Sequence, residues 1–211
     1  MNQDISPGKS PDLCLDMALE QLRDAALGLG AGEAGILLSD ALVVENRLAD
    51  YCIRPQCPGY GRSMSCPPHV GGPDWFREYL TRVLRVLVFK LDVATGILMS
   101  HERYPVIRRL HAMAASLERT AIDAGFSEAR AFAAGSCMQA FCNDHDSCSV
   151  LSGSECRYPD QARQSMSGMG VNVTLLAQAL GWEMKIITKD TDPESVPMGM
   201  MVGLVCLGQR R

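Results

Sequence analysis

The chain has 211 residues, of which 47% are hydrophobic, and its formal net charge at pH 7 is −4. This length and composition provide enough apolar surface for a folded core, and the acidic balance leaves no basic stripe for the phosphate backbone of a nucleic acid. No apolar run is long enough to span a membrane and the N-terminus lacks a secretory signal, so we expect a cytoplasmic protein that binds neither membranes nor nucleic acids.

The N-terminal part is predicted to begin with a helix and to continue into a hairpin. Residues 1–12 are a polar segment that we expect to be a flexible lead. Leu13–Leu29 repeats apolar residues at steps of three and four, as an amphipathic helix does, and Gly30 can end it. Ala34–Leu38 and Leu42–Glu45 flank a short polar turn, and this pattern predicts that they pair as a hairpin.

The middle of the chain alternates helix and strand patterns. Pro73–Thr81 is predicted to be a short helix with proline at its first position, where proline is favoured. Val83–Val93 is the strongest strand pattern in the chain. Ser100 can cap a long helix over His101–Ala124, and Ala129–Ala134 is predicted to be a strand.

The C-terminal part adds one helix and two strands. The patterns predict a helix over Val171–Leu180 and strands over Glu183–Thr188 and Met200–Leu207. Strands that alternate with helices, with hairpins at both ends, predict an α/β (α+β) fold in which a mixed β-sheet packs against helices. No break in composition marks a boundary, so we expect a single domain over residues 1–211.

Seven of the nine cysteines lie in two segments, each soon after a predicted strand, and the first segment is rich in glycine and proline. The first cysteine loop (residues 52–68) has the pattern Cys-x4-Cys-x8-Cys-Pro-Pro, and the second cysteine loop (residues 137–156) has Cys-x4-Cys-x5-Cys-x7-Cys. In a chain without a secretory signal, clustered thiols more often bind metal or perform redox chemistry than form disulfides. The candidate metal and cofactor ligands are Cys52, Cys57, Cys66, Cys137, Cys142, Cys148 and Cys156.

The spacing of the cysteines favours an iron–sulfur cluster over zinc. An all-sulfur ligand set suits either, but structural zinc sites typically use pairs two to four residues apart, and the gaps here are at the upper end of that range or wider. Iron–sulfur proteins tolerate four-residue gaps and can place proline directly after a ligand, as in Cys57-Pro58 and Cys66-Pro67. We therefore expect one or two clusters of the [4Fe–4S] type, with zinc as the alternative.

The number of ligands leaves the first cysteine loop incomplete. The second loop offers four thiols, whereas the first offers three. The fourth ligand could be His69, Cys14 or a second-loop cysteine, or it could be absent, which would leave an open position for a substrate. His145 is a competing nitrogen ligand. Cys14 and Cys206 sit within apolar patterns and are predicted to be ordinary buried side chains.

These motifs resemble, from about Ala34 to the C-terminus, an uncharacterised prokaryotic family labelled "predicted metal-binding protein", a domain of unknown function. The resemblance implies a protein of anaerobic bacteria or archaea whose cysteines hold a metal, with an iron–sulfur cluster expected, and it implies no particular reaction. Relatives tend to have a tighter Cys-x2-Cys-x2-Cys spacing in the second motif. The residues that carry the resemblance are Cys52-x4-Cys57-x2-Tyr60-Gly61, Ser65-Cys66-Pro67-Pro68, Ala134-Gly135-Ser136-Cys137 and Cys156-Arg157-Tyr158-Pro159.

The sequence thus predicts a cytoplasmic metal-binding protein, iron–sulfur in type, that acts in electron transfer or as a redox accessory factor with a redox partner protein. Two alternatives stay open. One is a zinc-stabilised binding protein without catalysis. The other is a metal-assisted enzyme with an open three-cysteine site, for which the sequence offers the acid or base candidates His69, Asp74, His101 and Glu102 without singling one out.

Overall fold

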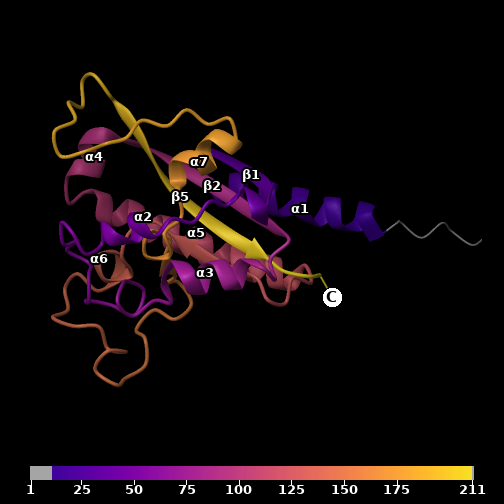
Figure 1. The fold of residues 1–211 in the computed structure, drawn as a ribbon, viewed down its shortest axis with the longest axis horizontal. Coiled ribbons are helices and arrows are strands. Elements are labelled where there is room, and N and C mark those ends of the chain that lie inside the picture. The colour runs from indigo at the N-terminus through magenta and orange to yellow at the C-terminus, as the bar shows by residue number, and fades with distance from the viewer. Residues whose placement is uncertain (1–10, 211) are drawn as a thin grey trace, which may run out of the picture.

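The structure, a computed structural model, describes residues 11–210 and is organised around one five-stranded β-sheet (Figure 1). The strand order is β1-β2-β5-β3-β4. All neighbours are antiparallel except β3 and β4, which are parallel, so the sheet is mixed as predicted. The strands are β1 (Glu33–Leu38), β2 (Arg85–Ala94), β3 (Arg130–Ala133), β4 (Gln164–Ser165) and β5 (Met198–Leu207).

The two long central strands explain why the sequence patterns of β2 and β5 are apolar almost without interruption. They pair along their whole length, from Arg85 opposite Leu207 to Ala94 opposite Met198. Alternate residues of β2 enter two different hydrophobic clusters, with Phe89 in one and Val88 in the other. A strand that is covered on both faces needs apolar residues at every position.

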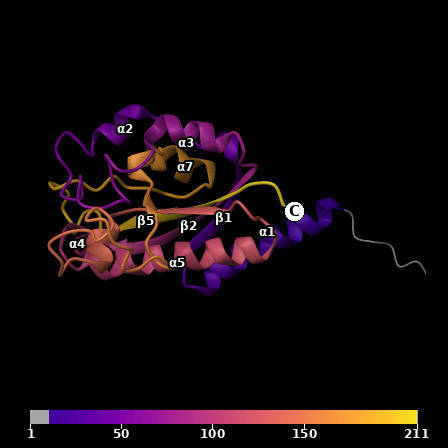
Figure 2. The ribbon, with the colours of Figure 1, turned by 90° about the horizontal axis from the view of Figure 1, so that it is seen from below.

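Helices cover both faces of the sheet, as Figure 2 shows. Helices α1 and α5 lie on one face and supply half of the buried residues of the first cluster, whereas α3 and α7 lie on the other with the short α2. The helices are α1 (Pro11–Gly28), α2 (Asn46–Asp50), α3 (Gly72–Leu80), α4 (Thr95–Met99), α5 (Arg103–Asp123), α6 (Cys137–Phe141) and α7 (Val173–Ala179), with 3-10 turns η1 (Ser39–Ala41) and η2 (Ser167–Met169). None of the described helices combines the length and apolar character needed to cross a bilayer.

Two predicted strands are wrong, both within the described part of the chain. Leu42–Glu45 does not pair with β1, because β1 pairs with β2 instead. Leu42 is buried in the cluster beneath α3 and α7, and Val44 forms a single bridge to Val171. Glu183–Thr188 is not a strand either. Met184 packs against the core, but Ile186 is 69% exposed, so the apolar side chains of this segment do not form one buried face.

The remaining predicted helices and strands agree with the structure to within a few residues at their ends, whereas the short elements α2, α4, α6 and β4 are not predicted from the sequence. Residues 1–10 of the expected flexible lead lie outside the described residues, and α1 already begins at Pro11.

Candidate metal centre

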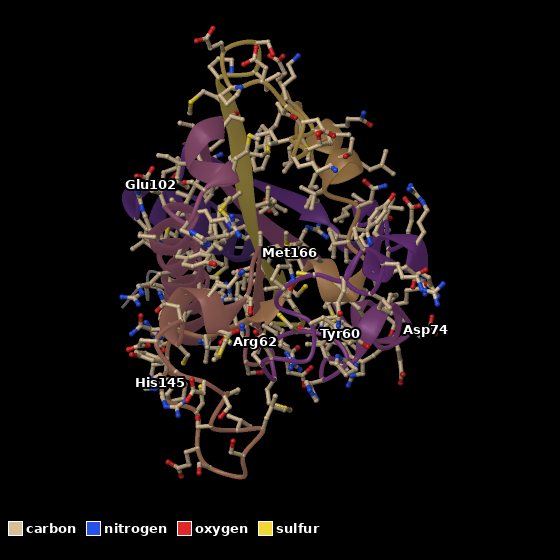
Figure 3. The ribbon with its side chains drawn as sticks, turned by 90° about the vertical axis from the view of Figure 1, so that its left-hand side faces the viewer. Tyr60, Arg62, Asp74, Glu102, His145 and Met166 are labelled. Atoms are coloured by element: carbon tan, nitrogen blue, oxygen red, sulfur yellow. The ribbon has the colours of Figure 1, made fainter. Side chains whose placement is uncertain are left out.

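The two cysteine loops meet at one end of the sheet. The second loop begins shortly after β3, and the first loop lies against β4, where the Ser165 N–H donates to the Ser65 carbonyl oxygen at 2.9 Å. Since β3 and β4 are paired neighbours, this contact brings the two loops to the same sheet edge. Figure 3 shows Tyr60 and Arg62 of the first loop and His145 of the second on the same side of the molecule.

One hydroxyl joins thiols of both loops. The Ser65 Oγ donates to the Cys137 Sγ at 3.0 Å and lies 3.9 Å from the Cys66 Sγ. The Ser63 Oγ is 3.0 Å from the Ser65 Oγ. Both serines are buried, so water does not replace these hydrogen bonds.

Cys137 is positioned by the turn between β3 and α6. Gly135 has φ +88°, and a Cβ there would lie 2.8 Å from the Ile107 Cγ2, so the turn requires glycine. Ser136 then caps α6, because its Oγ accepts a hydrogen bond from the Met138 N–H at 3.3 Å. These two residues fix Cys137 at the first position of the helix.

The first loop packs closely against this turn. A Cβ on Gly59 would lie 3.2 Å from the Ser136 Cβ and 3.6 Å from the Cys66 Sγ. The Gly59 N–H also donates to the Cys57 Sγ at 3.5 Å. A side chain at position 59 would therefore crowd the Ser136 side chain. Glycine avoids this contact, and its backbone amide lies against the Cys57 sulfur, a kind of contact that tunes metal thiolates.

Electrostatic coupling between the thiols also crosses from loop to loop. Burial raises the pKa of Cys52 to about 11, and the neighbouring thiols of Cys57 and Cys66 add to the shift. Burial likewise raises the pKa of Cys137 to about 11, with a further increase from Cys66 and Cys148. The Ser65 and Ser63 hydroxyls oppose this increase. Cys66 thus interacts with thiols of both loops.

The second loop holds its own three remaining thiols near one another. Burial raises the pKa of Cys142, the thiols of Cys156 and Cys148 add to the shift, and Arg157 opposes it. Burial also acts to raise the pKa of Cys148, but hydrogen bonds from backbone N–H groups, the first-loop Met64 among them, outweigh it and lower that pKa. The Tyr158 N–H donates to the Cys156 Sγ at 3.4 Å.

The thiols are neighbours without surrounding a common point. Within residues 11–210, no three His, Cys, Asp or Glu side chains are arranged as a group that could hold a metal ion. The donor chemistry nevertheless fits a soft metal, because the thiols stand beside hydroxyl and amide donors that can stabilise a thiolate. A metal bound here would require the thiol side chains to rotate toward one another.

The other predicted candidates make local contacts of their own, away from the contact between Ser65 and Cys137. His69 is exposed, and its N–H closes a turn onto the Cys66 carbonyl. His145 is 3.9 Å from Asp144. Asp74 pairs with Arg77 on α3, and in Figure 3 it lies on the opposite side of the molecule from Glu102. The acid and base candidates therefore do not form one group.

The two cysteines outside the loops have different surroundings. Cys206 is fully buried in β5, as predicted. The prediction for Cys14 is wrong: its side chain is exposed, and the Arg210 Nη1 donates to its sulfur at 3.1 Å. Cys14 lies on a face of α1 that does not enter the core, although the apolar pattern around it continues.

The sequence interpretation missed the serines. Ser63, Ser65 and Ser136 are buried beside the thiols, and none of them was a candidate. The available signal was that serine precedes cysteine directly in both loops, in Ser65-Cys66 and Ser136-Cys137.

A family model described as "Predicted metal-binding protein (DUF2284)" matches residues 36–206. The match covers most of the chain and includes both cysteine loops. Comparisons with curated proteins and with solved structures found no match.

Proposed function

The chain belongs to the predicted metal-binding protein family, and we propose that it holds an iron–sulfur centre bound by thiolates of both cysteine loops and uses this centre to transfer electrons. The observation that carries the proposal is the approach of Cys66 and Cys137, from different loops, to the single hydroxyl of Ser65. Buried polar contacts of this kind are costly unless the groups are satisfied, so they hold the two loops in a defined relation.

The ligand set that we propose consists of the three first-loop thiols and Cys137. Cys52 interacts with Cys57 and with Cys66, and Cys66 interacts with Cys137. Cys137 thus supplies the fourth ligand that the first loop lacks. The remaining thiols Cys142, Cys148 and Cys156 form a second group, which can bind a further metal with an open position.

The surroundings of the thiols favour a redox cluster. Amide and hydroxyl hydrogen bonds to sulfur adjust the reduction potential of iron–sulfur clusters, and Gly59 and Ser65 provide both kinds of donor. Exposed apolar side chains, Ile53 and Met64 among them, lie beside the thiols on the first loop, where a redox partner protein could dock. A redox partner would need to approach the end of the sheet where the cysteine loops meet, because the electrons would leave the cluster there.

The thiol pKa values predict how the apparent metal affinity depends on pH. Cys52 and Cys137, each with a pKa of about 11, are protonated at neutral pH and must lose their protons to become ligands. Metal binding therefore releases protons, and the apparent affinity increases as the pH rises toward these values.

The test is purification of the full chain without oxygen, followed by quantification of iron, acid-labile sulfide and zinc, and by electron paramagnetic resonance before and after reduction with dithionite. We expect iron and sulfide in cluster stoichiometry and a signal that changes on reduction. A four-thiolate set also suits structural zinc. One zinc per chain with no iron would reject the electron-transfer function in favour of a zinc-stabilised binding protein, and no bound metal would reject both.

A further inference from the structure

The serine pair between the loops has a chemical role that goes beyond its packing. Ser63 is fully buried and Ser65 is 6% exposed, and their hydroxyl oxygens lie 3.0 Å apart. Two hydroxyls in such a place must satisfy each other or a third group, because water is excluded. The third group here is the sulfur of Cys137.

The direction of the hydrogen bonds follows from the number of protons. A serine hydroxyl has one proton to donate and two lone pairs. The Ser65 proton points to the Cys137 Sγ at 3.0 Å. Ser65 can then accept from Ser63 through its oxygen, so the order is Ser63 to Ser65 to Cys137. In such a chain each hydrogen bond strengthens the next.

The donor Ser65 and the acceptor Cys137 are each attached to regular structure. The Ser65 carbonyl oxygen accepts from the N–H of Ser165 in β4, at 2.9 Å. Cys137 begins α6, which is capped by Ser136. The donor and the sulfur therefore approach each other from two separate elements, and their contact is set by the fold.

We propose that Ser65, oriented by Ser63, is a positioning residue that donates its hydroxyl proton to the sulfur of Cys137 and thereby joins the two cysteine loops into one metal-binding unit. The inference rests on the proposed function, since Cys137 is there a ligand. A metal thiolate that accepts a hydrogen bond is stabilised and held in one orientation, as are other metal ligands with outer hydrogen-bond partners. Removal of such a partner typically weakens metal binding by about 10–100-fold.

The test uses the full chain without metal and cobalt(II) or zinc(II) alone as the probe, titrated without oxygen against a competing chelator. We expect Ser65→Ala to weaken binding at least about tenfold. Its sulfur-to-cobalt charge-transfer band should move to lower energy, because the sulfur electrons lose the stabilising proton. Ser65→Thr keeps the hydroxyl and should restore both properties in large part.

Two further variants separate this role from simple damage to the fold. Ser63→Ala removes the group that orients Ser65 but keeps the Ser65 hydroxyl, which is the nearer donor to Cys137, so we expect a smaller loss of affinity and a smaller band shift in the same direction. Ser154→Ala is the matched control, because Ser154 is an exposed serine of the second loop and should leave binding unchanged. Thermal unfolding of each metal-free variant gives the structural effect of the substitution.

The outcomes distinguish the two proposals. If the unaltered chain binds neither cobalt nor zinc, the proposed function fails. If it binds them and folded Ser65→Ala binds equally well with an unmoved band, the role of Ser65 is wrong while the metal site stands. If Ser65→Ala does not fold, the Ser63→Ala variant decides by the same criterion.

Discussion

Two cysteines of this protein, Cys206 and Cys137, differ both in burial and in their neighbours, since Cys206 is fully buried and Cys137 is partly buried. Cys206 lies in β5 within a cluster of aliphatic and aromatic side chains, and burial raises its pKa. Cys137 receives a hydroxyl hydrogen bond from Ser65. In the sheet, the Cys206 thiol packs as a small apolar group. Where the two cysteine loops meet, the Cys137 thiol instead lies beside hydrogen-bond donors suited to a thiolate. Cys66, a candidate ligand beside the Ser65 hydroxyl, is buried as Cys206 is, so polar neighbours and not burial distinguish a candidate ligand from a thiol of the core.

The largest expected effect comes from removing one of the proposed cysteine ligands, where the two loops meet. Cys66→Ser and Cys137→Ser should each abolish the same metal signal, because each deprives one shared centre of a thiolate. We expect the metal content of both variants, measured by elemental analysis after anaerobic purification, to fall at least about tenfold. Separate signals, one lost in each variant, would show that the loops bind metal independently.

A second effect concerns His111, which is fully buried on α5 beneath the turn that leads to Cys137. Its Nδ1 accepts from the Arg163 N–H at 3.1 Å. Burial lowers its pKa from 6.5 to about 4, and the charge of Arg163 adds to the shift. Between these two pH values the unfolded chain takes up a proton that the folded protein does not.

The free energy of unfolding should therefore fall as the pH decreases from about 6.5 to about 4, by roughly 3 kcal/mol in total, and this contribution should be constant above that range. Urea unfolding of the metal-free protein at several pH values measures it. The His111→Gln variant cannot titrate and should lose this part of the pH dependence. An unchanged slope in that variant would mean that the buried histidine is not its source.

A third prediction concerns Cys206, the buried thiol of β5. Cys206→Ala removes a buried sulfur atom and leaves a small cavity, so we expect a loss of about 1 kcal/mol in the free energy of unfolding. Metal content should stay at the level of the unaltered chain. Loss of metal from folded Cys206→Ala would mean that burial among aliphatic side chains does not mark a structural thiol.

The smallest effect is expected at Cys14. Its side chain is exposed, and its contact with Arg210 lies on the surface. Cys14→Ser should change the free energy of unfolding by less than about 0.5 kcal/mol, as most surface substitutions do. It should also leave the metal content unchanged. The variant thus serves as the control in which a thiol outside the proposed ligand set is removed. A metal loss there would identify Cys14 as the missing ligand of the first loop.

The sequence predicts those parts of the fold that depend on local patterns. The apolar run of β2 and the three- and four-residue steps of α1 are such patterns, and both elements form where they are expected. The predicted hairpin between Ala34–Leu38 and Leu42–Glu45 is wrong, because strand pairing depends on residues that are far apart in the sequence. β1 pairs with β2, which arrives from beyond the first cysteine loop, in place of the segment that follows it directly.

The candidate site likewise combines a local sequence pattern with a long-range contact. The spacing of the cysteines is visible in the sequence, and this local pattern is enough to predict that both loops bind metal. The hydrogen bond from Ser65 to Cys137 is not visible there, because it joins residues that are 72 positions apart. Only the packing of the first loop against β4 and α6 brings the two side chains together.

The claim that both loops bind one metal is tested most directly by thiol alkylation with mass spectrometric mapping, before and after chelation of the bound metal. We predict that Cys52, Cys57, Cys66 and Cys137 are protected together in the metal-bound protein and become reactive together when the metal is removed. Protection confined to one loop, with Cys137 released independently of Cys66, would contradict the account.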